Sequence, residues 1–124
     1  KETFATSGPR IRVRFFAGYD FPADLLSRTD TVRQAYTHGV PMGGDLLPSK
    51  GRAPKFMVWA MRDPGSGYLQ RAQIVKVWIE NGVAKEKVFD VACADGGKVD
   101  PASARCQKVS SWSRNAATAT GLRR

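Results

Sequence analysis

The chain of 124 residues is 42% hydrophobic and 25% charged, which is the ordinary range for one globular domain that can bury a single core. It contains no apolar run of 18 or more residues, so no membrane-spanning helix is expected. The net charge of +9 is typical of nucleic-acid-binding proteins, but four basic residues lie in residues 107–124, where no acidic residue accompanies them.

Residues 10–16 alternate between apolar and basic side chains, which is the period-two pattern of a half-buried strand. The apolar face consists of Ile11, Val13 and Phe15, and the basic face of Arg10, Arg12 and Arg14. A solvated strand face explains these arginines at least as well as a nucleic-acid surface does.

A brief helix is expected after residue 30. Asp30 is a suitable N-cap, Val32, Ala35 and Tyr36 follow at helical spacing, and Gly39 suits the helix end.

A loop and a buried strand are predicted next. Residues 48–54 are a string of turn formers and should be an exposed loop. Residues 55–61 are apolar on both sides of the pattern, which favours a strand covered on both faces.

The strongest local prediction is a hairpin, because Asn81-Gly82 lies between two apolar-rich runs, residues 73–80 and 83–91. A two-residue turn pairs Glu80 with Val83 and places Lys76 opposite Lys87. The face predicted to be core carries Val75, Val77 and Ile79. The other face should be solvated because its lysines repel, and Trp78 on that face is expected to lie against a lysine stem.

Together these elements predict a mainly β fold, namely a small antiparallel sheet or β-sandwich with one short helix. Cys93 and Cys106 flank a turn-rich loop, so a disulfide is favoured over two free thiols and would indicate an oxidising compartment.

Catalytic patterns are sparse. His38 is the single histidine, so a metal site with Asp45 and one or both cysteines, or a hydrolase based on His38, is a weaker interpretation than a surface imidazole. Two glycine segments could present backbone N–H groups to an anion, although glycine beside Ser or Asp indicates a turn first of all. The candidate cleft or anion-binding residues are therefore Ser7, Gly8, His38, Gly43, Gly44 and Asp45. No catalytic or metal-ligating residue is assigned.

Five ordered blocks resemble the C-terminal region of a bacterial family of exported proteins, the domain-of-unknown-function family DUF3604. The blocks are FATSGPRIRVRFF at 4–16, GVPMGGDL at 39–46, APKFMVWA at 53–60, QIVKVW at 73–78 and EKVFDVA at 86–92. The family is similar in its upstream part to PHP metallohydrolases, in which clustered His, Asp and Glu hold divalent metals for phosphoester hydrolysis. Those clusters precede the Thr-Ser-Gly-Pro block, so the resemblance implies no cofactor in this chain and a divalent metal in the parent protein.

The resemblance implies three segments. Residues 1–10 would be the junction from an upstream catalytic domain, residues 11–106 a non-catalytic β-rich module, and residues 107–124 a basic tail unlike the family. It also implies a periplasmic or secreted bacterial location. The expected partners are the upstream domain and, through an open sheet edge, a second copy. Binding of nucleic acid or another polyanion is the alternative function, and the expected disulfide disfavours it inside cells.

Overall fold

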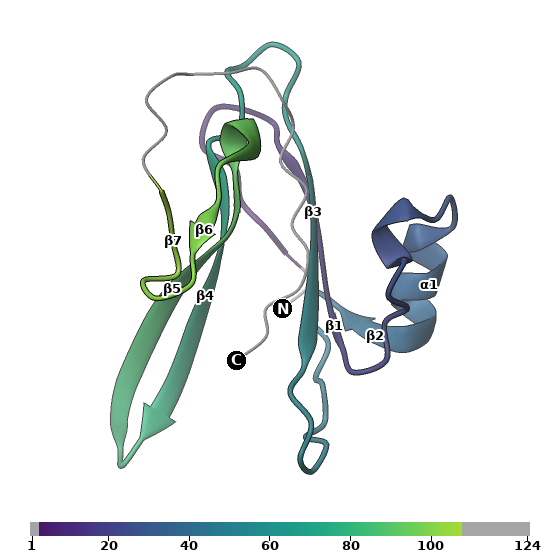
Figure 1. The fold of residues 1–124 in the computed structure, drawn as a ribbon, viewed down its shortest axis with the longest axis vertical. Coiled ribbons are helices and arrows are strands. Elements are labelled where there is room, and N and C mark those ends of the chain that lie inside the picture. The colour runs from purple at the N-terminus through teal and green to yellow at the C-terminus, as the bar shows by residue number, and fades with distance from the viewer. Residues whose placement is uncertain (1–2, 108–124) are drawn as a thin grey trace. The chain divides into compact units, whose positions relative to one another are not determined.

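The computed structural model describes residues 3–107, shown as a ribbon in Figure 1. They fall into two compact units, one ending at Gly67 and one beginning at Tyr68, which are considered separately. Among these residues the secondary structure is mainly small antiparallel sheets with one short α-helix, as predicted. No described helix is long and apolar enough to cross a membrane.

The first unit is built on a three-stranded antiparallel sheet. Its central strand β1 (Arg12–Gly18) lies between β2 (Gly39–Pro41) and β3 (Lys55–Met61). Phe16 is opposite Pro41 on one side and Met57 on the other. The pairing with β2 begins at Phe16, so within the described residues the first half of β1 has β3 as its strand neighbour. Self-association through this edge stays a prediction.

The core of this unit lies on a different face of β1 from the one predicted. The 3₁₀ turn η1 (Leu25–Ser27) and the helix α1 (Thr31–His38) contribute Leu25 and Ala35, which pack with Phe16, Phe21 and Met57. Phe16 is 2% exposed and shares its face with Arg12 and Arg14, whereas Phe15 on the opposite face is half-buried. The predicted alternation is present in β1. The helix, however, covers the end of the face that carries Arg12, Arg14 and Phe16.

The prediction that β3 is covered on both faces holds for its first half only. Met57 is buried and Phe56 is half-buried, but Trp59 and Met61 are 40% and 43% exposed. The buried positions of β3 lie opposite the end of β1 that carries the core, and the exposed positions lie opposite its start.

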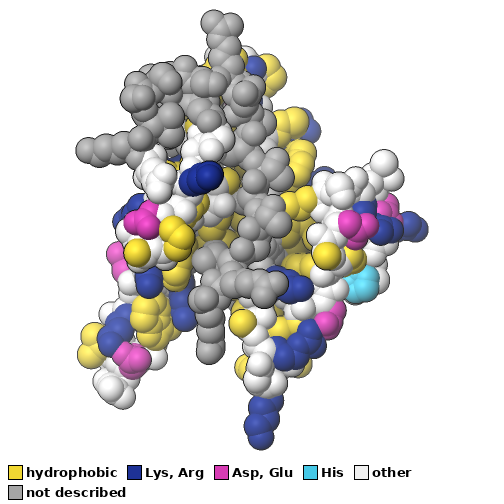
Figure 2. Space-filling view, in the orientation of Figure 1, with side chains coloured by type: hydrophobic (Ala, Val, Ile, Leu, Met, Phe, Trp, Pro, Cys, Tyr) yellow, Lys and Arg dark blue, Asp and Glu magenta, His cyan; other side chains and the backbone are white. Residues whose placement is uncertain are grey.

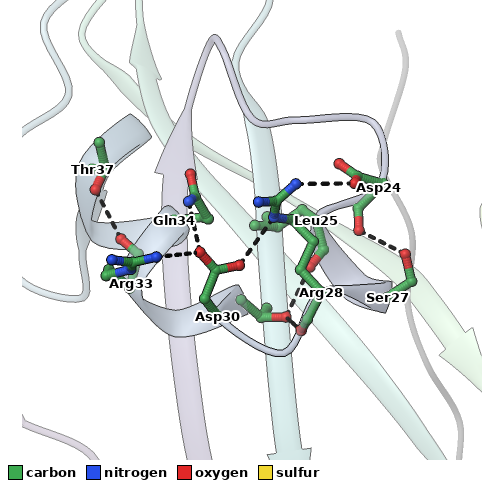
Figure 3. A network of polar contacts seen from close by, with 9 residues as sticks. Asp24, Leu25, Ser27, Arg28, Asp30, Arg33, Gln34 and Thr37 are labelled. Carbon is green, nitrogen blue, oxygen red and sulfur yellow. Dashed lines mark hydrogen bonds and ion pairs between the residues drawn. The ribbon is translucent and has the colours of Figure 1, made fainter.

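The helix α1 begins after Asp30 and ends before Gly39, as predicted, but neither residue acts in the expected way. The Asp30 side chain makes no bond to a helical backbone N–H; its carboxylate accepts hydrogen bonds from Gln34 (2.8 Å), Arg33 (2.8 Å) and Arg28 (3.0 Å) (Figure 3). These bonds, that from Gln34 foremost, hold the pKa of Asp30 well below its ordinary value. Gly39 has an extended backbone with φ −156°, so it is not a left-handed cap. A Cβ there would lie 2.6 Å from the carbonyl oxygen of Ala17, so space requires glycine.

The second unit contains the predicted hairpin, formed by β4 (Arg71–Glu80) and β5 (Val83–Cys93). Asn81 and Gly82 both have positive φ, 52° and 76°, as a two-residue type I′ turn requires. Glu80 pairs with Val83 and Lys76 with Lys87, so the predicted register is confirmed. The register shifts between Ala72 and Gln73, beyond the part that the turn determines.

The burial predicted for the hairpin is wrong. Val75, Val77 and Ile79, expected in the core, are 55%, 67% and 76% exposed. Figure 2 shows hydrophobic and basic side chains together along this hairpin. Alternation identified the residues that share a face, but a two-stranded ribbon needs a third element to bury that face.

A short third sheet closes the described part of the second unit. After the 3₁₀ turn η2 (Ala94–Gly96), β6 (Val99–Asp100) pairs with β7 (Arg105–Cys106). The predicted disulfide between Cys93 and Cys106 is present, with a Cα–Cα distance of 5.8 Å. The predicted tail lies outside the described residues from position 108 onward.

The buried carboxylate of Asp90 joins β5 to β7. It accepts hydrogen bonds from the Gln73 side chain (2.6 Å) and the Cys106 backbone N–H (2.7 Å), and Arg71 and Arg105 lie at 3.5 and 3.8 Å. Burial opposes ionisation of this carboxyl, but the hydrogen bonds and the two arginines outweigh it and lower the pKa of Asp90.

Candidate functional site

The candidate site is a pocket of about 680 Å³ within the first unit. Its floor is the sheet face opposite the helix, with Phe15 and Ala17 from β1 and Phe56 from β3. Its walls come from Tyr19, just after β1, and from residues 40–54, which include β2 and the loop that follows it. A volume of this size is in the range of small-molecule sites.

Two aromatic rings form the apolar part of the floor. Phe15 and Phe56 stack with ring centroids 5.7 Å apart and an interplanar angle of 9°. The stack follows from the register, because Phe56 lies opposite Ala17 and is therefore the diagonal neighbour of Phe15 on the same face. Both side chains are half-buried, so the pair borders the pocket rather than the core.

The hydroxyl of Tyr19 fixes one wall of the pocket. It donates a hydrogen bond to the carbonyl oxygen of Leu47 (3.1 Å) and accepts one from the backbone N–H of Ser49 (3.1 Å). Since both the donor and the acceptor capacity of the phenol are used on the loop, Tyr19 ties residues 47–49 to the end of β1. The pocket wall is therefore held in place without a ligand.

Arg52 fixes the loop at a second point. Its guanidinium carbon lies 5.3 Å from the centroid of the Tyr19 ring, and its two terminal nitrogens donate to the two carboxylate oxygens of Asp20. The hydrogen bond from Arg52 is the main reason why the pKa of Asp20 is lowered, and Asp20 in turn raises the pKa of Arg52. Both side chains are about half exposed or more, so the ion pair adds little stability. Of the described residues that line the pocket, Arg52 alone is charged.

Comparison with protein families assigns the sequence. The family model described as "Protein of unknown function (DUF3604)" matches residues 1–121. The chain belongs to the DUF3604 family. The matched range is longer than the resemblance predicts, since it continues past Cys106 into the segment expected to be unlike the family. Neither a curated protein nor a solved structure was found to match the chain.

In this DUF3604 chain, two of the predicted anion-binding residues reach the pocket. Gly43 and Gly44 line it, at the turn that follows β2. The backbone N–H of Gly44 donates to the carbonyl oxygen of Pro41 (3.0 Å), and Gly43 has a φ of 89°. Gly43 and Gly44 therefore form a turn, as their sequence pattern indicates. Asp45, the next residue, is exposed and is not among the residues that line the pocket.

The other predicted residues of the DUF3604 chain lie elsewhere. Ser7 and Gly8 are exposed in the segment before β1, and His38 is exposed as the last residue of α1. None of the three lines the pocket, and the structure does not bring them together with Gly43 and Gly44 there. Among residues 3–107, no group of three or more His, Cys, Asp or Glu side chains is placed to hold a metal ion. The roles suggested for these residues stay predictions.

Sequence reasoning missed Tyr19, Ser49 and Arg52, which define the polar side of the pocket. Arg52 lies in the string of turn formers, and its partner Asp20 is 32 positions earlier. No periodic pattern links positions so far apart in two irregular segments. Tyr19 and Arg52 both lie next to strands, but an aromatic and a cationic residue in such positions are too common to predict a binding site. Only the three-dimensional structure shows that they lie together.

A second surface on the DUF3604 chain is the lysine face of the β4–β5 hairpin, defined by Lys76, Trp78, Lys85, Lys87 and Phe89. The Nζ of Lys76 lies 4.9 Å from the ring centroid of Trp78, which confirms the predicted lysine and tryptophan contact. The Nζ of Lys87 lies 5.2 Å from the ring of Phe89. Lys85 is paired with Glu80, whereas Lys76 and Lys87 face each other across the strands.

Proposed function

We propose that the chain is a non-catalytic accessory module of an exported bacterial, PHP-related, metal-dependent hydrolase. Membership of the DUF3604 family is the observation that carries this proposal. It rests also on the expectation from the sequence that the family is similar to PHP metallohydrolases upstream of the blocks found here. The partner is then the catalytic domain of the same polypeptide, and a phosphoester is the expected substrate class.

The chemistry of the residues agrees with this division of labour. Several His, Asp and Glu ligands must converge to hold the catalytic metals of a hydrolase. The sequence has one histidine, His38, and it is exposed at the end of α1. The module instead offers a pocket with fixed walls, which suits a part that shapes or extends a neighbouring binding site.

The disulfide supports the exported part of the proposal. Disulfides persist in oxidising compartments such as the periplasm or the extracellular space and are rare in the reducing cytosol. The bond between Cys93 and Cys106 joins the end of β5 to β7 and thereby closes the turn-rich segment between them.

The test compares the 124-residue chain with the same chain joined to its upstream catalytic domain. Both are assayed for bound metal by elemental analysis and for hydrolysis of bis(4-nitrophenyl) phosphate with added Mn²⁺ or Zn²⁺. The isolated chain should hold no stoichiometric metal and should show no turnover above the blank, while the longer protein turns the ester over. A metal-loaded isolated chain whose activity is abolished by His38→Ala would refute the proposal.

A second function, binding of a polyanion, is favoured by the lysine face of the hairpin. Lys76 opposite Lys87 is a like-charge cross-strand pair, which destabilises a free hairpin and is relieved when an anion lies between the two ammonium groups. Trp78 and Phe89 beside them are rings on which nucleic-acid bases can stack.

This second function is tested by the salt dependence of oligonucleotide binding. For single strands each phosphate contact contributes about −0.7 to the slope of log K against log salt concentration. The double variant Lys76→Gln/Lys87→Gln should therefore reduce the magnitude of the slope by about 1.4. The control Lys50→Gln/Lys55→Gln removes the same charge from the first unit and should leave the slope unchanged. Equal slopes in all three proteins would exclude the hairpin as the binding surface.

A further inference from the structure

The pocket beside Phe15 and Phe56 has a composition that neither a packing defect nor a phosphate loop would produce. Its lining is mostly apolar and includes three aromatic rings, and its single charged group among the described residues is Arg52. Sites for small molecules combine an apolar body with a few fixed polar groups in this way. A ligand that fits this pocket should therefore have both an apolar body and a charged group.

The apolar side suits a flat ring. The stacked pair Phe15 and Phe56 supplies aromatic surface at the floor, and aromatic contacts add to the burial of area when rings stack or meet edge to face. The phenol of Tyr19 is engaged by the loop, and its ring face is covered by the guanidinium of Arg52. A planar ligand thus finds its apolar contacts mainly at the phenylalanine pair.

The charged side suits an acidic group. A guanidinium has five N–H donors in a planar fork that matches a carboxylate or a similar oxyacid. Arg52 uses two of them on Asp20, a carboxylate at the protein surface with 67% of its side chain exposed. Asp20 is not among the residues that line the pocket, but it competes with an acidic ligand for the guanidinium, and the remaining donors of Arg52 are on a side chain that does line the pocket.

The walls are held in position before any ligand arrives. Tyr19 ties residues 47–49 to the end of β1, and its ring also lies against the guanidinium of Arg52 at the end of the same loop. A site whose walls are already fixed loses less conformational entropy on binding than a mobile loop would.

We propose that this pocket binds a small aromatic anion, with its ring against Phe15 and Phe56 and its acidic group at the guanidinium of Arg52. The proposal goes beyond the accessory role and does not depend on it, because every contact belongs to the first unit of this chain. It also assigns the anion to an arginine side chain rather than to the backbone N–H groups of the glycine turn.

The probe is 2-naphthoate, with the neutral isostere 2-naphthamide for comparison. Each is titrated into the ¹⁵N-labelled 124-residue chain at neutral pH and low salt, and backbone amide shifts are followed. Saturable shifts should appear at Ala17, Gly43 and Phe56 with naphthoate, and the naphthamide should bind about tenfold more weakly, since bonds to a charged partner are the stronger ones. Shifts confined to the hairpin amides, or absent, would overturn the proposal.

Two substitutions with opposite expected effects locate the charge. Arg52→Gln should raise the Kd for naphthoate about tenfold, whereas Arg33→Gln, which removes an exposed arginine from α1, should leave it unchanged. Asp20→Asn should lower the Kd, because it removes an internal competitor for the guanidinium while the ring of Tyr19 still holds Arg52 at the pocket, and Asp24→Asn should have no effect. If Arg52→Gln does not fold, the comparison of Asp20→Asn with its control Asp24→Asn tests the proposal. Equal Kd values for Asp20→Asn and wild type, or for acid and amide, would refute the role of Arg52.

Discussion

Replacing Asp90 with Asn is the most informative perturbation of the second unit. The Asp90 side chain is fully buried and accepts hydrogen bonds from the side chain of Gln73 and the backbone N–H of Cys106. Asparagine has nearly the same shape, but it replaces one acceptor oxygen with an NH₂ donor and removes the negative charge. The substitution therefore tests polar pairing with little change in packing volume.

The expected loss of stability in Asp90→Asn depends on which hydrogen-bond donors can adjust to the new side chain. The Gln73 amide can rotate so that its oxygen accepts from the new NH₂ group, but the Cys106 N–H is fixed by the backbone and must keep the remaining oxygen. The charge-assisted part of these bonds and the attraction to Arg71 and Arg105 are lost in either case. Hydrogen bonds to charged groups contribute about 1.5–3 kcal/mol each, so Asp90→Asn should destabilise the second unit by about 2–4 kcal/mol.

Native-state hydrogen exchange measures this loss within the unit. The backbone N–H of Asp90 donates to the carbonyl oxygen of Ala104 at 2.8 Å, and that of Cys106 donates to Asp90, so both amides report the connection of β5 to β7. A loss of about 2 kcal/mol corresponds to exchange about 30-fold faster. The control Glu86→Gln, an exposed carboxyl on β5, should leave the rate of the Asp90 amide unchanged.

The same carboxylate gives the second unit a defined pH dependence. Because the pKa of Asp90 is lower in the folded protein than in the unfolded chain, its stabilising effect is complete above the unfolded value of about 3.9. The effect is lost as the pH falls through the lower folded value.

If the Asp90 and Cys106 amides of the Asp90→Asn variant exchange within threefold of the wild-type rate at neutral pH, the buried network does not join β5 to β7 as described.

Three further predictions concern other features of the chain. Gly39→Ala places a Cβ 2.6 Å from the carbonyl oxygen of Ala17 and should destabilise the first unit by about 1–3 kcal/mol in urea unfolding, whereas Gly67→Ala, with nothing within 4 Å, should be nearly neutral. Reduction of the disulfide between Cys93 and Cys106 should lower the stability of the second unit by about 3 kcal/mol, measured by hydrogen exchange with and without reductant. In an NMR pH titration the Asp30 carboxyl should ionise below its ordinary value of 3.8, and its contribution to the start of α1 should persist until the pH falls below that value; titration at or above 3.8 would contradict the hydrogen bonds assigned to it.

Features that depend on near neighbours in sequence were predicted well. Asn81-Gly82 fixes a two-residue turn through the positive φ that both residues adopt, and from it the register of the hairpin follows. The disulfide was likewise predicted from the turn-rich loop between its cysteines. For these two features the deciding interactions join residues a few positions apart or flank a single loop. The limits of α1 were also predicted, but Asp30 does not cap the helix through its side chain and Gly39 is required by its close approach to Ala17, which is distant in sequence.

Burial was predicted less well, because alternation shows which residues share a face and not what covers that face. In β1 the helix covers the end of the face that carries Phe16, so the strand's buried positions are not those of the apolar stripe. In β4 the stripe is intact, but Val77 and Ile79 remain exposed in the described structure. Which element covers a strand face depends on segments that are distant in sequence, and a short pattern gives no information about them.

The pocket likewise depends on segments that are distant in sequence, and only its glycine turn is visible as a sequence motif. Gly43 and Gly44 form a visible motif, but the backbone N–H of Gly44 is occupied by the carbonyl oxygen of Pro41 within the turn. The positive group at the pocket is instead Arg52, which lies against the ring of Tyr19 and is paired with the carboxylate of Asp20. Both of those residues follow β1 directly, and the loop after β2 returns to them because β1 and β3 are antiparallel neighbours. An anion site in this chain thus arises from strand topology, and the opposite effects expected for Arg52→Gln and Asp20→Asn test that origin directly.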